Sequence, residues 1–552
     1  MKPNQSFIAT IAAAVAVLML SVVTGYAQGG GVGPDKLELE NDLQLNLDEM
    51  EKPALETPPV TNKVETSGMT YEEKDIKADT DYEPLPVRPP KPPKVPMDKL
   101  YPNFLRLGYG RFASILGDLH LGTNRSIKGS AGLDFSHRSS SNGYVNDAEF
   151  RDNLGAIYGE YYANGHTLGA KLSIQNSNYF YFADSIVEQN PEWRDSIRET
   201  FTRVIFDASL ARNYTPGEVN YDVGLNFNGF FDNHKKIDKG KDIHLSLLPQ
   251  ADWTITDQFG ADVRGQLTFS NTEFDSVQQS RFFLDFTPTV KFKTGNLRAE
   301  AGIKINSLSD STTHFGAFPI LRAAYGLVEN KLTVSAGLQG EMNYLRFTDL
   351  IEENRFLDRD VDIRPSSERF NLYLGLDGQV AKYLDFSIRA YTKRVKNQLV
   401  YFTPQDGAYF QMLYDSSFGQ SGLTASLIFN KQDKIRAGVK GEFRTFTLSN
   451  LSHNFGIPKV QVDFWASYNF AKKVWVSTEV FLYGSRVMSI DSVGNPIQAG
   501  LVPDVRLSAD YRFNERISVF FGLNNILGID WQRWHNYRMR PFYVQAGATL
   551  SF

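Results

Sequence analysis

The sequence of 552 residues contains no cysteine. This absence excludes a disulfide framework, thiolate metal sites, a cysteine nucleophile and a lipid-modified cysteine anchor. An excess of one charge is also missing, because 58 basic residues almost balance 63 acidic ones and leave a net charge of -5. That balance provides no basic surface for nucleic acid, so no nucleic-acid partner is expected. Aromatic residues are abundant at 13%, which argues against a largely disordered chain.

Long apolar runs are confined to the start of the chain. Lys2 precedes an apolar run from Phe7 to Val23, and small residues precede a cleavage site after Ala27. The pattern predicts a secretory signal peptide over residues 1–27, with a membrane anchor as the alternative. No later stretch is apolar over the length that a spanning helix needs. The exported chain is therefore expected to be either soluble or a β-barrel.

Residues 28–99 differ in composition from everything that follows. Residues 35–83 carry 15 Asp/Glu and 5 Lys/Arg, a net charge of -10. Residues 84–96 include seven prolines. Such a run favours a polyproline II spacer of roughly 40 Å. We expect a disordered tether, acidic and then proline-rich, that lies in the periplasm and reaches partners there.

Two features of the tether are candidate docking elements. Short runs of leucine between residues 37 and 47 alternate with polar residues, as in a strand offered to the edge of a partner's sheet. Ordinary disordered chain is the alternative, since two short runs are a limited pattern. The candidate contact residues here are Leu37, Leu39, Pro89 and Pro90.

From residue 104 onward the chain alternates apolar and polar residues with the period of a β-strand. In the last stretch Val544, Ala546 and Leu550 fall on one face, and Gln545 and Thr549 fall on the other. About 22 such segments can be counted, or 20 to 24 if two are merged or split. The predicted fold class is all-β: an antiparallel transmembrane β-barrel over residues 100–552.

The connections between these segments alternate in length. Short turns such as 163–165 and 514–515 are followed by long loops, which is typical of a bacterial outer-membrane barrel with short periplasmic turns. A soluble β-sandwich or propeller also has many short strands, but neither predicts this alternation together with a signal peptide. An even strand number places both chain ends in the periplasm. The predicted long connections are Ser139–Phe150, Ala183–Ile197, Asp232–Lys239, Asn271–Gln279, Phe347–Pro365, Thr403–Phe418, Ser449–Gly456, Ser485–Gly500 and Asp530–Asn536.

The C-terminal residues resemble a known family. Ile517–Leu527 is similar to the penultimate barrel strand of TonB-dependent receptors, and a loop with Trp531 and Trp534 and a last strand ending at Phe552 follow it. Tyr101–Gly110 resembles the start of receptor barrels common in Bacteroidota. The count of about 22 strands agrees with the barrel of that family. We take Phe552 as the expected C-terminal signal for the barrel-assembly machinery.

One departure from that family concerns its plug. Such receptors carry a globular plug before the first strand, whereas residues 29–99 have neither the length nor the apolar pattern of one. We therefore expect a barrel without a plug, and we do not carry over the mechanism of active uptake. A barrel of this size needs a blocked lumen. Inward-folded loops, lumenal side chains or another protein would each provide the block.

The loops Phe347–Pro365 and Thr403–Phe418 are rich in aromatic and charged residues. Long structured loops are usually functional, so we interpret these two as a docking surface or a lid. A solvated extracellular fringe is the alternative. The candidate docking residues of the loops are Phe356, Tyr409, Phe410 and Tyr414.

Metal-ligand spacing gives one partial match. Asp358, Asp360 and Asp362 have the spacing that begins a calcium loop, but Ile363 and Arg369 stand where that loop needs Gly and Glu. The eight histidines form no His-x-x-x-His pair. No metal site and no cofactor are expected.

His137 and Ser139 form the one candidate for catalysis. They point to the same side of a strand, on the face that also carries Leu133 and Phe135. The pair resembles the His-x-Ser of outer-membrane phospholipase A, which implies a histidine that activates a serine toward lipid. A third, orienting group is open between Asn142 and Asn153. A polar strand end that enters a turn explains the same residues, and we do not expect an enzyme.

Three functional hypotheses follow, in order of preference. The first is a non-enzymatic outer-membrane barrel that acts as a subunit or scaffold of an envelope complex. Its partners would be surface lipoproteins or periplasmic factors, besides outer-membrane lipid and the assembly machinery. The alternative is a loop-gated channel, similar to a TonB-dependent receptor, for uptake of a bulky polar solute. The third is a lipid hydrolase that uses His137 and Ser139.

Overall fold

The computed structural model describes residues 101–552, except 125, 142, 146, 184–195, 214, 216, 234–239, 275–276, 330, 361 and 432–433. The predicted signal peptide (1–27) and tether (28–99) lie outside the described residues. Their candidate contact residues Leu37, Leu39, Pro89 and Pro90 therefore stay predictions, as does the absence of a plug.

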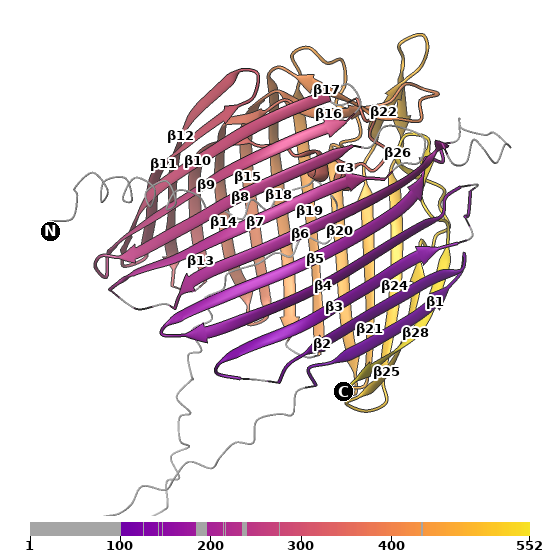
Figure 1. Cartoon of the computed structure of the whole chain (residues 1–552), viewed down its shortest axis with the longest axis horizontal. Coiled ribbons are helices and arrows are strands. Elements are labelled where there is room, and N and C mark those ends of the chain that lie inside the picture. The colour runs from indigo at the N-terminus through magenta and orange to yellow at the C-terminus, as the bar shows by residue number, and fades with distance from the viewer. Residues whose placement is uncertain are drawn as a thin grey trace, which may run out of the picture. The chain divides into compact units, whose positions relative to one another are not determined.

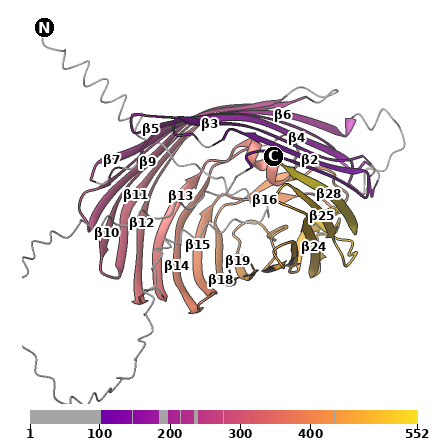
Figure 2. The ribbon, with the colours of Figure 1, turned by 90° about the horizontal axis from the view of Figure 1, so that it is seen from below.

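Twenty-two strands form one closed antiparallel sheet, so both the fold class and the predicted strand number are confirmed. Figure 2, a view from below, shows the strands arranged as a ring. The barrel strands are β1 (Phe104–Gly110), β2 (Ser114–Gly122), β3 (Gly129–Ser140), β4 (Phe150–Ala163), β5 (His166–Phe180), β6 (Arg198–Arg212), β7 (Val219–Asp232), β8 (Lys241–Thr254), β9 (Phe259–Phe274), β10 (Val277–Thr294), β11 (Leu297–Ser309), β12 (Thr313–Val328), β13 (Leu332–Asn343), β14 (Ser366–Ala381), β15 (Leu384–Lys396), β18 (Phe418–Lys431), β19 (Ile435–Thr447), β20 (Val460–Phe470), β21 (Val474–Tyr483), β24 (Val502–Arg512), β25 (Ile517–Asn524) and β28 (Tyr543–Ser551).

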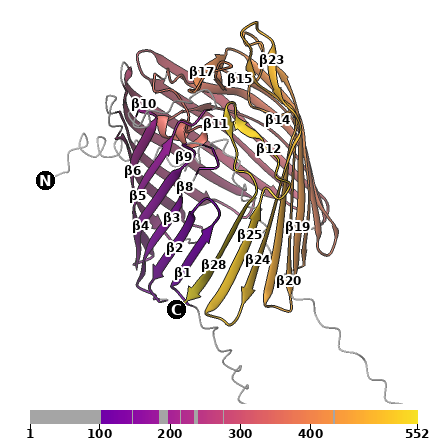
Figure 3. The same ribbon diagram turned by 90° about the vertical axis from the view of Figure 1, so that its right-hand side faces the viewer.

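Each strand pairs with its neighbour in the chain, and the first strand pairs with the last. β1 and β28 run side by side at this seam (Figure 3), with Phe104 opposite Ser551 and Gly110 opposite Gln545. The backbone N–H of Phe552 donates to the carbonyl of Asn103 at 3.0 Å and extends the ladder by one residue. The seam leaves no free sheet edge, which a lipid environment requires.

Apolar side chains point outward from the barrel, as the alternation predicts. On β14, Phe370, Leu372 and Leu374 are 40%, 49% and 62% exposed, whereas the residues between them are partly covered. In a bilayer this exposed apolar surface contacts lipid. At the two-residue turn between β4 and β5, Asn164 and Gly165 have φ of 50° and 74°, the left-handed conformation that tight hairpins favour.

The two rims of the barrel differ. At one rim no connection is longer than 123–128, whereas the other rim carries loops such as 344–365 and 397–417. The predicted long connection Asn271–Gln279 is wrong. β9 continues to Phe274 and β10 begins at Val277, because Thr272 and Phe274 are buried against other elements at this rim and stay extended.

The long-loop rim carries short elements that do not belong to the barrel sheet. Figure 1 shows several of them gathered at that end of the barrel. The predicted connection Asp530–Asn536 is longer than expected, because Tyr537 lies in one of these elements and the last strand begins at Tyr543. Among the described residues, no helix is both long and apolar enough to cross a membrane. The short elements are α3 (Phe347–Glu353) and the hairpins β16 (Gln398–Phe402) with β17 (Gln411–Asp415), β22 (Arg486–Ile490) with β23 (Pro496–Ala499), and β26 (Gln532–Trp534) with β27 (Tyr537–Arg538).

Candidate functional site

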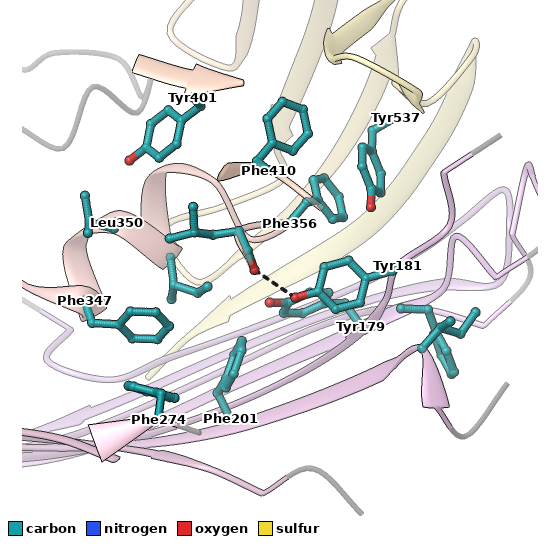
Figure 4. Packing of buried hydrophobic residues seen from close by; sticks show 14 of the residues in the cluster. Tyr179, Tyr181, Phe201, Phe274, Phe347, Leu350, Phe356, Tyr401, Phe410 and Tyr537 are labelled. Atoms are coloured by element: carbon teal, nitrogen blue, oxygen red, sulfur yellow. Dashed lines mark hydrogen bonds between the residues drawn. The ribbon is translucent and has the colours of Figure 1, made fainter. Parts of the chain in front are cut away.

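Three loops fold inward at the long-loop rim and pack on the inner wall of the barrel. The loops are 344–365, 397–417 and 525–542, and the wall is the end of β5 to β9 (Figure 4). We call the buried side chains of this contact the mouth cluster. From the loops it contains Phe347, Leu350, Ile351, Phe356, Leu357, Ile363, Tyr401, Phe410 and Tyr537, and from the wall side Tyr179, Tyr181, Phe201, Phe230 and Phe274.

Helix α3 is held on the wall by a buried carboxylate. Asp242 on β8 accepts the backbone N–H of Thr348 at 3.2 Å. The same carboxylate accepts from the hydroxyl of Thr272 at 2.6 Å and contacts His244 at 2.7 Å. Asp242 and His244 are both 0% exposed, so the loop covers polar groups that would otherwise line the lumen.

The loops are also joined to one another. The rings of Phe356 and Tyr537 stack with a centroid separation of 3.5 Å. The backbone N–H of Asp358 donates to Phe410 at 2.8 Å, and that of Phe410 donates to Phe356 at 2.9 Å. On the wall, the hydroxyl of Tyr179 donates to the carbonyl of Arg355 at 2.6 Å. The loops therefore form one packed unit rather than a solvated fringe.

A buried ion cluster lies beside these aromatic contacts. Arg359 is 9% exposed, and its guanidinium pairs with Asp232 at 2.8 Å and with Glu199. Burial alone lowers the pKa of Arg359, but Glu199 and Asp232 outweigh burial and raise it. The cluster joins loop 344–365 to the ends of β6 and β7.

Asp415 ties the β16–β17 hairpin to the neighbouring loop. Its buried carboxylate accepts backbone N–H groups from Ser417 (3.0 Å), Ser449 (2.9 Å), Asn450 (3.2 Å) and Leu451 (3.2 Å). Burial raises the pKa of Asp415, but these four donors stabilise the charged form and lower the pKa overall.

For Glu353, at the end of α3, burial outweighs the favourable interactions, so its pKa is raised. It accepts a hydrogen bond from the hydroxyl of Tyr401 at 3.0 Å. Burial raises the pKa of Glu353, and the hydrogen bond and Arg533 only partly reverse this effect. The two loop carboxyl groups therefore respond to pH in opposite directions.

A cavity of about 280 Å³ lies between α3 and the inner wall of β4 to β7. Arg203 and Glu352 form an ion pair across it. Arg355 and Gln175 add further polar groups, and Tyr179 provides an aromatic surface. Ligand pockets commonly occupy about 300–1,000 Å³. The cavity is thus slightly smaller than the usual range.

The four aromatic residues predicted to dock a partner have different environments. Phe356 and Phe410 are 6% and 2% exposed inside the mouth cluster, whereas Tyr409 is 40% exposed. Tyr414 is half-buried, and its hydroxyl donates to the carbonyl of Asp362 at 2.9 Å. Docking of a partner stays a prediction, and of these four side chains Tyr409 is the most accessible.

No group of three or more metal-ligating side chains is found in the described part of the chain. Of the aspartates with calcium-loop spacing, Asp362 pairs with Arg364 at 2.6 Å, and Asp358 accepts the backbone N–H of Asp360 at 3.4 Å.

The structure brings His137 and Ser139 together with a third residue on the outward face of the barrel. His137 Nδ1 lies 2.7 Å from Asn153 Oδ1, and His137 Nε2 lies 3.0 Å from Ser139 Oγ. Asn153, on β4, is thus the orienting group of the two that the sequence left open. Asn142 lies outside the described residues.

Known structures share this fold. The FrpB iron transporter of Neisseria meningitidis (F3-3 variant) aligns with a TM-score of 0.65 at 9% identity, over 83% of this chain and 82% of that one. A ferric enterobactin receptor (PfeA) variant of Pseudomonas aeruginosa gives 0.63 at 11%, over 82% and 80%. FpvA of P. aeruginosa, solved with pyoverdine, gives 0.64 at 12%, over 82% and 72%. No protein-family model and no curated protein matches the chain.

These neighbours are TonB-dependent receptors, and the chain has their barrel fold. The resemblance seen in the C-terminal residues is confirmed at that level. The chain is a closed 22-strand antiparallel β-barrel of that kind. The neighbours are transporters and receptors rather than enzymes.

Proposed function

We propose that this protein is a loop-gated outer-membrane channel for uptake of a bulky polar solute. The observation that carries the proposal is the mouth cluster, in which three loops of a 22-strand barrel fold inward and bury aromatic and charged side chains together. The neighbours named for iron transport and ferric enterobactin binding support uptake better than the scaffold role that the sequence favoured. A ferric siderophore is therefore the first solute class to test.

Gating follows from the size of the closed cavity. At about 280 Å³, the cavity between α3 and the wall is too small for a bulky solute. Admission of such a solute would require the loops to leave the wall. Arg203, Arg355 and Tyr179 would then present cationic and aromatic groups to it. A lid of this kind commonly closes over a ligand by loop movement.

Conductance and uptake test this function together. The full-length protein in planar bilayers is expected to conduct little, and a variant lacking residues 347–363 is expected to conduct strongly. Cells that express the wild type should take up radiolabelled ferric enterobactin or ferric pyoverdine, and excess unlabelled chelate should compete. A variant that conducts no better than the wild type, together with no uptake of either chelate, would contradict the proposal.

The scaffold role keeps one observation in its favour. The tip of the β22–β23 hairpin exposes Val493, which is 84% accessible, and Leu501 beside the hairpin is 67% accessible. Exposed apolar groups at a rim suit contact with another envelope protein. Mild detergent extraction followed by affinity purification separates the two functions. A stoichiometric complex that conducts no ions, with or without residues 347–363, would favour the scaffold role.

Residues 28–99 and the C-terminal Phe552 have proposed roles within the same function. Residues 28–99 would lie in the periplasm as a tether, with Leu37, Leu39, Pro89 and Pro90 as contacts for a periplasmic factor. Phe552 would serve as the signal for the assembly machinery, and its 47% exposure leaves it accessible. Protease protection of a tag placed within residues 28–99 in intact cells tests the first of these roles.

A further inference from the structure

The outward face of β3 changes from apolar to polar along its length. Leu133 and Phe135 are 37% and 44% exposed on the lipid-facing side. His137 and Ser139 continue the same face toward the long-loop rim, because alternate residues of a strand share a side. The two polar residues therefore stand where the apolar band ends, and in outer-membrane barrels such a band ends at the polar interface of the bilayer.

The hydrogen bonds at this boundary set the chemical state of the histidine. Asn153 stands directly opposite His137 in the β3–β4 register, and its Oδ1 accepts from Nδ1 at 2.7 Å. Nδ1 therefore carries the proton, and Nε2 has a free lone pair. Ser139 Oγ, 3.0 Å from Nε2, donates its hydroxyl proton to that lone pair. Consecutive hydrogen bonds thus link a nucleophile, a base and a group that orients the base.

We propose that Ser139, His137 and Asn153 form a catalytic site on the outward face of the barrel that hydrolyses the acyl ester of a membrane lipid. This activity is independent of solute uptake through the lumen, because the three side chains lie on the opposite side of the barrel wall. The hydrogen bonds that link Asn153, His137 and Ser139 form one continuous series at the end of the apolar band.

The reaction needs only the ester and water. Ser139 Oγ attacks the carbonyl carbon while His137 Nε2 takes the hydroxyl proton. The tetrahedral oxyanion collapses, the alkoxide of the lipid leaves, and that oxygen takes the proton from Nε2. Water then attacks the acyl-Ser139 ester and gives its proton to Nε2. The fatty acid leaves, the serine oxygen regains the proton, and the site returns to its first state.

The surroundings of Ser139 provide a cation and a space. Arg151, an exposed residue, is directly opposite Ser139 in the register and is placed to stabilise the oxyanion. Gly155 lies on the same face of β4, and a Cβ added there would meet nothing within 4 Å, so the surface beside Phe135 is open to an acyl chain. Ser139 itself is 7% exposed, so neighbouring side chains have to move before a substrate reaches its hydroxyl.

A polar belt around the rim is the competing explanation. Asn176 and Thr202 continue the polar outward face on β5 and β6, with Nδ2 and Oγ1 3.2 Å apart. Such a belt stabilises strand ends and has no nucleophile. The two explanations differ in the reactivity of Ser139, which is measurable directly.

Covalent labelling of the full-length protein in detergent micelles is the first test. A fluorophosphonate probe, which modifies activated serines, is expected to label the wild type at Ser139. Labelling should be absent in Ser139→Ala and His137→Ala. Ser136→Ala is the matched control, because Ser136 is on the same strand but on the lumen face, where it bonds Asp118 at 2.8 Å. Labelling of the wild type equal to that of Ser139→Ala would overturn the proposal.

Lipid hydrolysis is the second test. Wild-type protein is incubated with vesicles of phosphatidylethanolamine and phosphatidylglycerol, and separately with vesicles that contain lipid A, and released fatty acid is measured. Release from either lipid supports the site and identifies its substrate. Ser139→Ala should lose more than about 1,000-fold of the rate, as expected for removal of a nucleophile. No release above the Ser139→Ala background from both lipids would overturn the proposal.

Asn153 acts through His137, so its role is that of a positioning residue. Asn153→Ala is expected to lower kcat with little change in KM, and Asn153→Asp is expected to restore much of kcat, because a carboxylate also accepts from Nδ1. A structural role would leave kcat unchanged. Uptake of solute by Ser139→Ala should equal that of the wild type, so failure of the uptake function and failure of this site are distinguishable.

Discussion

The two halves of the barrel have different roles in closing its mouth: one supplies the inner wall and the other supplies the loops. Strands β5 to β9 supply a wall on which Tyr179, Phe201, Phe230 and Phe274 are buried. The strands from β13 to β28 supply the loops that cover this wall. The strand ladder is continuous around the ring and does not depend on that contact. Closure of the mouth and integrity of the barrel are therefore separable, and mutations can loosen one without the other.

The largest effect is expected from emptying the mouth cluster. Phe356→Ala combined with Phe410→Ala removes two rings that pack on Tyr537 and so join the three loops. Each such truncation in a packed core costs about 3–5 kcal/mol. The loops should leave the wall while the barrel stays folded. Single-channel conductance should rise, and amide exchange of residues 344–365 should quicken. Phe443→Ala, a 51%-exposed residue on the lipid face of β19, should change neither.

Breaking the ion cluster between loop and wall should have the next largest effect. Arg359→Gln removes the guanidinium that pairs with Glu199 and Asp232, and loss of one member of a buried pair costs about 3–5 kcal/mol. Limited proteolysis of loop 344–365 should accelerate. Arg364→Gln is the matched control: its side chain is 57% exposed and its pair with Asp362 should contribute about 0–1 kcal/mol. Equal effects of both variants would show that the buried cluster does not hold the loop.

A smaller effect, confined to contacts between loops, is expected at Asp415. Because its pKa is lowered in the folded protein, its stabilisation is present above the unfolded pKa of about 3.9 and is lost as pH falls through the folded value. Asp415→Asn should cost about 1.5–3 kcal/mol near neutral pH, as charged hydrogen bonds do. Amide exchange of residues 449–451 measures this loss of stability. Asp491→Asn, at an exposed hairpin turn, should leave that exchange unchanged.

The smallest effect should appear at Glu353, with the opposite sign. Its pKa is raised, so its stabilisation is present below the unfolded pKa of about 4.3 and declines as pH rises through the folded value. Glu353→Gln keeps the hydrogen bond from Tyr401 and should remove this pH dependence, an effect of about 0.5–1.5 kcal/mol. Amide exchange of α3, measured from about pH 4 to about pH 8, tests this pH dependence. If the exchange of α3 still depends on pH in Glu353→Gln, another titratable group causes the dependence.

The fold was predictable because the strand signal is local. Alternation along each segment identifies the lipid face without any knowledge of neighbours, and 22 strands were counted on that basis. The Asn271–Gln279 error has a non-local cause. Its polar residues suggest a loop, yet Thr272 bonds Asp242 at 2.6 Å and Phe274 lies 4.1 Å from Phe347 between ring centroids. Those partners are distant in sequence and give no local signal.

The sites were less predictable for the same reason. The aromatic loops were identified by composition, but which rings face inward depends on the wall that they meet. Arg359 forms ion pairs with Glu199 and Asp232 on two different strands, and no spacing in the sequence links the three residues. Asn153 was one of two candidates beside His137. Choosing between them needs the register of β3 against β4, which a long connecting loop leaves open.

The seam between β1 and β28 has a consequence for biogenesis. Phe104 can pair with Ser551 only after the whole barrel sequence has been synthesised. Until then the sheet has two unpaired edges, which cannot enter lipid without a large cost from unsatisfied peptide groups. Pairs so distant in the chain also form slowly, because a very long loop must close first. We therefore expect the nascent barrel to need protection of both edges, and we expect loss of β28 alone to leave the remaining strands unable to insert.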